Sequence, residues 1–108
     1  MEQINKIVNL TAHTINEVST GNSYPVSGIV ARVKQQTVTA YRHAGIPVYR
    51  SKMGEVEGLP ATVEGTIYIV SALALMAVPK DRTDVVSPGS LQRNERGQPI
   101  GCMGFRTR

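Results

Sequence analysis

One long apolar run, residues 65–79, constrains the fold of this 108-residue chain more than any other feature. Residues 66–70 are β-branched or aromatic, which is typical of a buried strand. Residues 72–78 are rich in Ala, Leu and Met, which favour a helix, and Pro79 cannot continue one. Ser71 stands at the junction, where its hydroxyl is suited to cap the first helical turn. The run therefore predicts a strand that leads directly into the main helix, with the rest of the chain packed around both.

Short strand-like segments separated by turn residues make up the rest of the chain. Strands are predicted at residues 6–10, 15–18, 29–34, 36–42, 46–50 and 85–86. Turns are predicted at residues 19–23, 43–45 and 87–90, a loop around a short strand at 53–60, a hairpin over 91–102 and a frayed tail at 106–108. Pro47 predicts that the strand at 46–50 is an edge strand or a bulged one.

The sum of these segments predicts one domain over residues 1–108 with an α+β fold. Its short strands are expected to be mostly antiparallel, with a partly closed barrel as one possible arrangement, and its one main helix lies near residues 72–78.

The charge balance favours an anionic partner. The net charge is +4, with eight Arg and four Lys, and the planar guanidinium of Arg matches phosphate and carboxylate groups. A charge of this size also falls in the normal range for the solubility of a small domain, so the charge alone leaves both interpretations open.

Several classes of protein are disfavoured by the sequence. Cys102 is the only cysteine, which excludes an internal disulfide and a cysteine-based metal cage. His13 and His43 are thirty residues apart, without the spacing of metal ligands, so no metal and no cofactor are expected. The apolar run is shorter than the ~20 residues of a membrane span, and the first residues lack the apolar segment of a signal peptide. We expect a cytoplasmic protein without membrane association.

Catalysis has no decisive signature in this chain. Ser71 follows a predicted strand, as a nucleophile does in many hydrolases, but Ile69 and Leu73 occupy the places where the Gly-x-Ser-x-Gly motif needs glycine. A helix cap is the favoured interpretation of Ser71. A small hydrolase using Ser71 or His13 is an alternative, and a non-enzymatic protein is preferred.

Anion binding is the hypothesis with the clearest physical basis. A helix that begins after residue 70 offers free backbone N–H groups, and Arg32 and Arg82 are placed to complete a phosphate site. Arg82 equally suits an ion pair with Asp81 or Asp84. The predicted ligand-binding residues are Ser71, Arg32, Arg82, Asp84, His13 and Tyr41. The predicted function is the binding or sequestering of a phosphorylated, nucleotide-like small molecule by a homo-oligomer whose subunits share a pocket.

A nucleic-acid-binding or protein-binding module is the second alternative. Tyr41 and Tyr49 flank a predicted turn beside Arg42 and Arg50, and exposed tyrosines among cations are typical of surfaces that bind nucleic acid.

Six segments carry a resemblance to a known family. They are residues 7–13 (IVNLTAH), 25–33 (PVSGIVARV), 57–60 (EGLP), 66–71 (TIYIVS), 82–89 (RTDVVSPG) and 97–102 (GQPIGC). Together they resemble a family of small proteins of bacteria and their phages that has no assigned activity, so the resemblance implies no catalytic residues. Ala12 departs from the proline expected before His13 in that pattern.

The resemblance implies a phage context. Small phage accessory proteins without catalytic motifs are often binders that modulate the host, and one class sequesters the cyclic nucleotide messengers of antiviral defence. This chain is similar to such anti-defence sponges in size, strand content and Arg content, an analogy without a shared motif.

Overall fold

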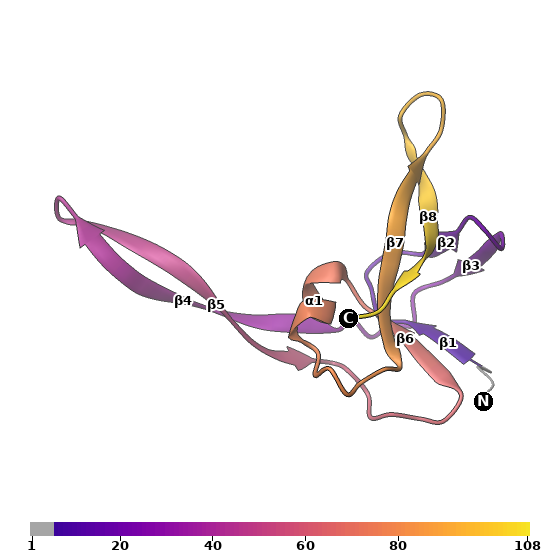
Figure 1. Ribbon diagram of the computed structural model, residues 1–108, viewed down its shortest axis with the longest axis horizontal. Helices are drawn as coiled ribbons and strands as arrows, with labels where there is room; N and C mark the ends of the chain where they lie inside the picture. The colour runs from indigo at the N-terminus through magenta and orange to yellow at the C-terminus, as the bar shows by residue number, and fades with distance from the viewer. Residues whose placement is uncertain (1–5) are drawn as a thin grey trace.

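The structure, a computed structural model, describes residues 6–108 (Figure 1). Its elements are β1 (Lys6–Asn9), β2 (Ile15–Glu17), β3 (Asn22–Tyr24), β4 (Arg32–His43), β5 (Ile46–Glu57), β6 (Thr66–Ile69), α1 (Ala72–Ala77), β7 (Val85–Arg93) and β8 (Pro99–Arg106). The expectation that no signal peptide is present depends in part on residues 1–5, which lie outside the described residues. Over residues 6–108 the fold is mostly β, with one short helix.

Six strands form one mixed sheet in the order β1-β6-β7-β8-β2-β3. The predicted antiparallel pairing holds for β2–β3, β4–β5 and β7–β8. Three other pairings are parallel, since β6 pairs in parallel with both β1 and β7 and β2 pairs in parallel with β8. A parallel bridge joins Asn9, at the end of β1, to Val26, just beyond β3. The two ends of the sheet therefore approach each other, and the sheet is nearly closed and barrel-like.

The apolar run forms the centre of the core, as predicted. Tyr68, Ile69 and Val70 are buried at β6 and the residue that follows it, and Ala74 and Leu75 are buried on α1. Because β6 and β7 are parallel, the chain must cross from the end of one strand to the start of the other, and α1 lies on that crossover. The helix is therefore part of the long connection that the parallel pairing of β6 and β7 needs.

Both ends of α1 are capped by side chains. The Ser71 hydroxyl oxygen accepts a hydrogen bond of 3.2 Å from the backbone N–H of Ala74, which confirms the predicted cap. At the other end, Arg108 donates from Nη1 to the carbonyl oxygen of Val78. The expectation of a frayed tail is therefore wrong at Arg108, because the last helical carbonyls lack partners within the helix and accept from a nearby cation.

Strands β4 and β5, twelve residues each, form a two-stranded arm that projects from the body (Figure 1). Ala44 (φ 51°) and Gly45 (φ 79°) make its turn at the predicted place, with the positive φ angles of a tight hairpin turn. At the root, Val33 lies opposite Val56, and both pack against the core. The arm raises the radius of gyration to 17.0 Å, against about 13 Å for a compact chain of this length.

Two predicted boundaries near the arm are wrong. The strand expected from residue 29 begins at Arg32, and the segment 53–60, expected as a loop around a short strand, continues the long strand β5 as far as Glu57. Gly54 suggested a loop, but it lies where the register of the arm shifts between Val33 and Gln35. A β carbon at Gly54 would lie 2.9 Å from the carbonyl oxygen of Lys34, so the glycine marks a bulge within a continuing strand.

The turn predicted at residues 87–90 is also wrong, because β7 continues through it. Val86 is the last β7 residue that pairs with β6. At Pro88 the edge of β7 on the β6 side is therefore free, and it tolerates a residue without a backbone N–H. Gly89 is required by a close approach, since a β carbon there would collide with the carbonyl oxygen of Met103 on β8.

Candidate functional site

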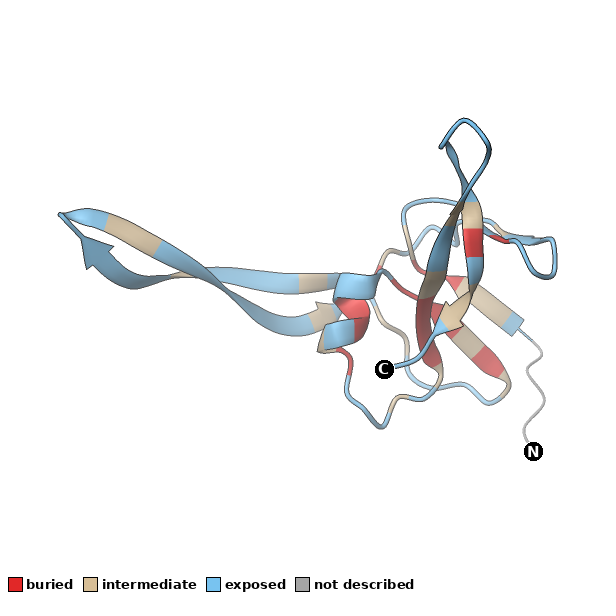
Figure 2. Ribbon diagram, turned by 45° about the horizontal axis from the view of Figure 1, so that its top comes forward, coloured by how far each residue is buried: buried red, intermediate tan, exposed pale blue. Residues whose placement is uncertain are grey.

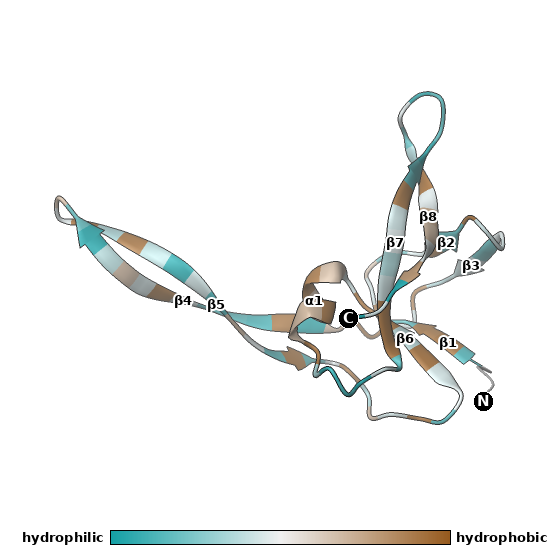
Figure 3. Cartoon of the chain, in the orientation of Figure 1, coloured by the Kyte–Doolittle hydropathy of each residue, from teal (hydrophilic) through white to brown (hydrophobic). Residues whose placement is uncertain are grey.

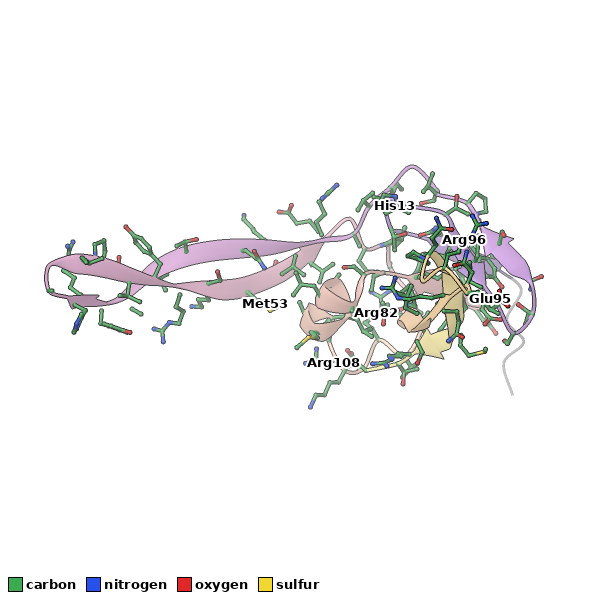
Figure 4. All side chains as sticks on the ribbon, turned by 90° about the horizontal axis from the view of Figure 1, so that it is seen from above. His13, Met53, Arg82, Glu95, Arg96 and Arg108 are labelled. Carbon is green, nitrogen blue, oxygen red and sulfur yellow. The ribbon has the colours of Figure 1, made fainter. Side chains whose placement is uncertain are left out.

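Three of the six predicted ligand-binding residues lie together. His13, Arg32 and Ser71 line one open cleft of about 420 Å³ at the root of the arm. They come from the loop after β1, the first residue of β4 and the residue before α1, and all three are exposed. Figure 4 shows His13 on the body near the start of the arm. The cleft combines a guanidinium, an imidazole and a hydroxyl group, which is a chemistry suited to an anion.

The loop that carries His13 is held by Asn9, which is not among the predicted site residues. Asn9 is 2% exposed, and its Oδ1 accepts from the N–H and the hydroxyl of Thr11 at 2.8 and 2.7 Å. Its Nδ2 donates to the carbonyl oxygens of His13 at 2.7 Å and Tyr24 at 2.9 Å. The signal for this role was the Asn-x-Thr spacing, since an Asn side chain commonly bonds the backbone two residues on.

Ser71 keeps a hydrogen-bonding capacity beyond its role as a cap. Its oxygen accepts from Ala74, and its hydroxyl proton remains able to donate toward the cleft. The residues that line the cleft include no carboxylate to orient His13 as a base. The arrangement therefore supports binding of an anion better than activation of a serine nucleophile.

Arg82 and Asp84 lie apart from this cleft and bind each other. Arg82 Nε donates to Asp84 Oδ1 and Nη2 donates to Oδ2, both at 3.0 Å. Nη2 also donates to the carbonyl oxygen of Pro60 at 2.9 Å, so the pair joins two loops. Their mutual hydrogen bond is the main cause that raises the pKa of Arg82 and lowers the pKa of Asp84. Of the two interpretations open for Arg82, the structure has the ion pair, with Asp84 as its partner.

Tyr41, the sixth predicted residue, lies on the arm rather than at the cleft. It is 61% exposed, and Tyr49 on the other strand is 60% exposed. Figure 2 shows the arm exposed along nearly its whole length, while the buried residues gather in the body. Figure 3 shows apolar and polar residues interspersed along the ribbon. The arm therefore exposes large side chains without a partner in the rest of the described chain.

The outer part of the arm, residues 34–52 and called the distal arm below, carries the net charge of the protein. It contains Lys34, Arg42, Arg50 and Lys52 and no Asp or Glu. The rest of the chain is balanced, with eight Lys and Arg against eight Asp and Glu. Of these four cations the sequence pointed to Arg42 and Arg50, but it did not show their isolation from carboxylates, because a long protruding arm was not predicted.

Comparison with known proteins gives no relative, since no protein-family model, curated protein or solved structure matches the chain. In the part of the chain that the structure describes, no helix is long and apolar enough to cross a membrane. Residues 6–108 also contain no cluster of three or more His, Cys, Asp or Glu side chains arranged to hold a metal ion. A function for this protein has to be inferred from the geometry of the arm and the cleft.

Proposed function

We propose that the protein is a nucleic-acid-binding module and that the distal arm contacts the phosphate backbone. The observation that carries this proposal is that a charge equal to the whole net charge of +4 lies on the distal arm, residues 34–52, which contains no carboxylate. Cations that neutralise phosphates release condensed counterions, and this release supplies much of the affinity of proteins for nucleic acid.

The remaining side chains of the distal arm suit the same ligand. Seven of them are exposed groups that can donate hydrogen bonds to phosphate oxygens. They are Gln35, Gln36, Thr37, Thr39, Tyr41, Tyr49 and Ser51. A polyanion approaching this ribbon meets donors and cations and no repelling carboxylate.

Pairing of the arm with a strand of another protein is disfavoured by its edges. Pro47 lacks a backbone donor, and the register shifts at Lys34 and Ala40 interrupt the ladder. Charged side chains, proline and bulges are the devices that protect exposed edges from strand addition. The arm is therefore better suited to contacts through its side chains than through its backbone.

The test is the affinity for a labelled DNA duplex, measured by fluorescence anisotropy at low salt. Arg42→Gln/Arg50→Gln should weaken binding at least about tenfold, because two charge-assisted contacts are lost. Arg93→Gln/Arg96→Gln is the matched control, since it removes the same charge from the β7–β8 hairpin, and it should leave the affinity within about twofold. An equal loss of DNA affinity in the arm variant and in the control variant would contradict a specific role of the arm.

A second candidate function is the binding of a phosphorylated, nucleotide-like small molecule in the cleft, and it is favoured by the grouping of His13, Arg32 and Ser71 there. In this candidate the protein is a cytoplasmic, sponge-like homo-oligomer. Exposed Leu73 and Met76 on α1 offer apolar surface for self-association. Calorimetry with nucleotides and cyclic dinucleotides should show heat that Arg32→Gln abolishes and Arg106→Gln preserves. Absence of heat with the unaltered protein would remove this candidate.

A further inference from the structure

Each side chain of the distal arm lies on one of the two faces of the ribbon, and the strand register determines which one. Strand β5 has no extra residue between Ile46 and Met53, so its side chains alternate regularly between the faces there. Residues directly opposite each other on the two strands share a face. The face of Arg50, called the basic face below, is defined by the even-numbered residues 46–52 of β5 and the β4 residues opposite them. Figure 4 shows side chains projecting from both sides of the arm.

Three of the four cations of the distal arm lie on the basic face. Arg50 and Lys52 are two positions apart on β5 and therefore share it. Lys52 lies opposite Gln36, and Lys34 shares the face of Gln36 two positions away on β4. Lys34, Gln36 and Lys52 also line one open hollow of about 260 Å³. Glu55, just outside the distal arm, borders this hollow at the root, so the part of the face without carboxylates runs from the two lysines toward the turn.

An exposed aromatic ring lies on the basic face together with these cations. Tyr41 lies opposite Val48, which is two positions from Arg50 on β5 and shares its face. The fourth cation, Arg42, lies opposite Pro47 and therefore on the other face. The basic face thus combines three cations with one tyrosine.

A bulge at Ala40 produces this combination. Ala40 is an extra residue in β4, since the register shifts there while β5 continues without an insertion. In a regular ladder Tyr41 would lie opposite Pro47 and Arg42 opposite Ile46. All four cations would then share one face, and both tyrosines of the arm would lie on the other. The bulge therefore exchanges Arg42 for Tyr41 on the basic face.

We propose that the basic face binds single-stranded nucleic acid, with phosphates on its cations and a base stacked on Tyr41. This inference rests on the proposed nucleic-acid-binding function and names the form of its ligand. A single strand offers phosphates and unpaired bases together, and every base has a face that stacks on an aromatic ring. A duplex keeps its bases stacked inside, so a fourth cation would suit it better than a ring. The exchange of Arg42 for Tyr41 therefore favours the single strand.

The first test compares a thymidine oligonucleotide, a uridine oligonucleotide and a DNA duplex of equal length in equilibrium binding at about 0.15 M salt. Phosphate contacts weaken as salt is added, whereas base stacking on a ring does not depend on counterion release. At least one of the single strands should bind at least about fivefold more tightly than the duplex, and the tighter one distinguishes DNA from RNA. A duplex affinity equal to or above that of both single strands would overturn the inference.

The second test compares two tyrosines that are similarly exposed on opposite faces. Tyr41→Ser should weaken single-strand binding at least about fivefold, because the stacking of one base is lost, and should leave duplex binding within about twofold. Tyr49→Ser is the matched control, since Tyr49 is equally accessible but lies on the face without Arg50. It should leave both affinities within about twofold. Equal losses of single-strand affinity in the two variants would contradict stacking on Tyr41.

The third test moves the ring of Tyr41 and keeps every charge. Insertion of an alanine between Val48 and Tyr49 gives Ala40 a partner, so the ladder becomes regular and Tyr41 moves to the other face. This insertion should abolish the preference for single strands. Deletion of Ala40 is the control, because it also makes the ladder regular but keeps Tyr41 opposite Val48, and it should retain the preference. Circular dichroism checks that both variants fold.

The failure of this inference is distinguishable from the failure of the proposed function. Loss of the single-strand preference in both the insertion and the deletion variant, or in neither, would overturn the role of the basic face and leave the arm as a nucleic-acid-binding element. Failure of the unaltered protein to bind any of the three ligands would instead overturn the proposed function itself.

Discussion

The carboxylate of Glu17 accepts a hydrogen bond of 2.7 Å from the backbone N–H of Gly104, which is 87 residues away in sequence. The same carboxylate accepts from the N–H and hydroxyl groups of Ser19 and Thr20, so it closes the turn after β2 while it ties β2 to β8. Glu17 is 4% exposed. The Ser19 hydroxyl, followed by the backbone N–H groups of Gly104 and Ser19, holds the pKa of Glu17 far below its usual value.

Glu17→Gln should lower the melting temperature at pH 7, because an amide accepts fewer and weaker hydrogen bonds than a carboxylate. A carboxylate whose pKa is depressed by folding stabilises the protein above its unfolded pKa of about 4.3, and that stabilisation is lost as the pH falls toward the folded pKa. The difference in melting temperature between Glu17→Gln and the parent protein should therefore become smaller below about pH 4. Glu95→Gln, an exposed control in the β7–β8 turn, should leave the melting temperature unchanged.

Arg82 and Asp84 should show strong coupling in a double-mutant cycle. Arg82→Gln or Asp84→Asn alone should lower the free energy of unfolding by about 2 kcal/mol, since each leaves a partly buried charge without its partner. Urea denaturation of the two single variants and the double variant measures the coupling. If the losses in the free energy of unfolding of the two single variants add up to the loss of the double variant, the pair does not stabilise the two loops that it joins.

Gly89→Ala should destabilise the protein by roughly 1–3 kcal/mol, because its β carbon would collide with the backbone of Met103. Ser90→Ala, at the next and exposed position of β7, should stay within about 0.5 kcal/mol of the parent. Equal effects of the two substitutions in urea denaturation would contradict the close approach of β7 and β8.

Ser71→Ala should cost about 1 kcal/mol of stability through loss of the helix cap, and Ser71→Asp should retain most of it. Neither change should alter binding of DNA by the arm, since Ser71 lines the cleft at its root. If Ser71→Ala and Ser71→Asp lower the free energy of unfolding by the same amount, the side-chain oxygen at this position does not cap α1.

The centre of the fold could be predicted because composition and burial agree there. Tyr68, Ile69 and Val70 have no plausible place except a buried strand, and Pro79 ends the helical segment that follows. The turn of the arm was predicted but its full length was missed, because Gly54 resembles a loop residue when it in fact accommodates a bulge. Pro88 was likewise interpreted as a turn residue. A proline fits within a strand only at a free edge, and the sequence does not show that β7 has a free edge there.

The candidate sites could be predicted only in part. His13, Arg32 and Ser71 were selected for their chemistry, but they come from three separate segments whose proximity depends on the sheet order. The grouping of Tyr41 with Arg50 depends on a single extra residue, Ala40, and no local pattern identifies the strand position at which a bulge forms.

The salt dependence of duplex binding tests the central claim most directly. Four arm cations in contact with phosphates predict that a plot of log affinity against log salt concentration has a slope of about −3.6. Replacement of Lys34, Arg42, Arg50 and Lys52 by Gln should bring this slope close to zero and reduce binding accordingly. A slope that is unchanged in that variant would show that DNA contacts another surface, and it would contradict the role assigned to the arm.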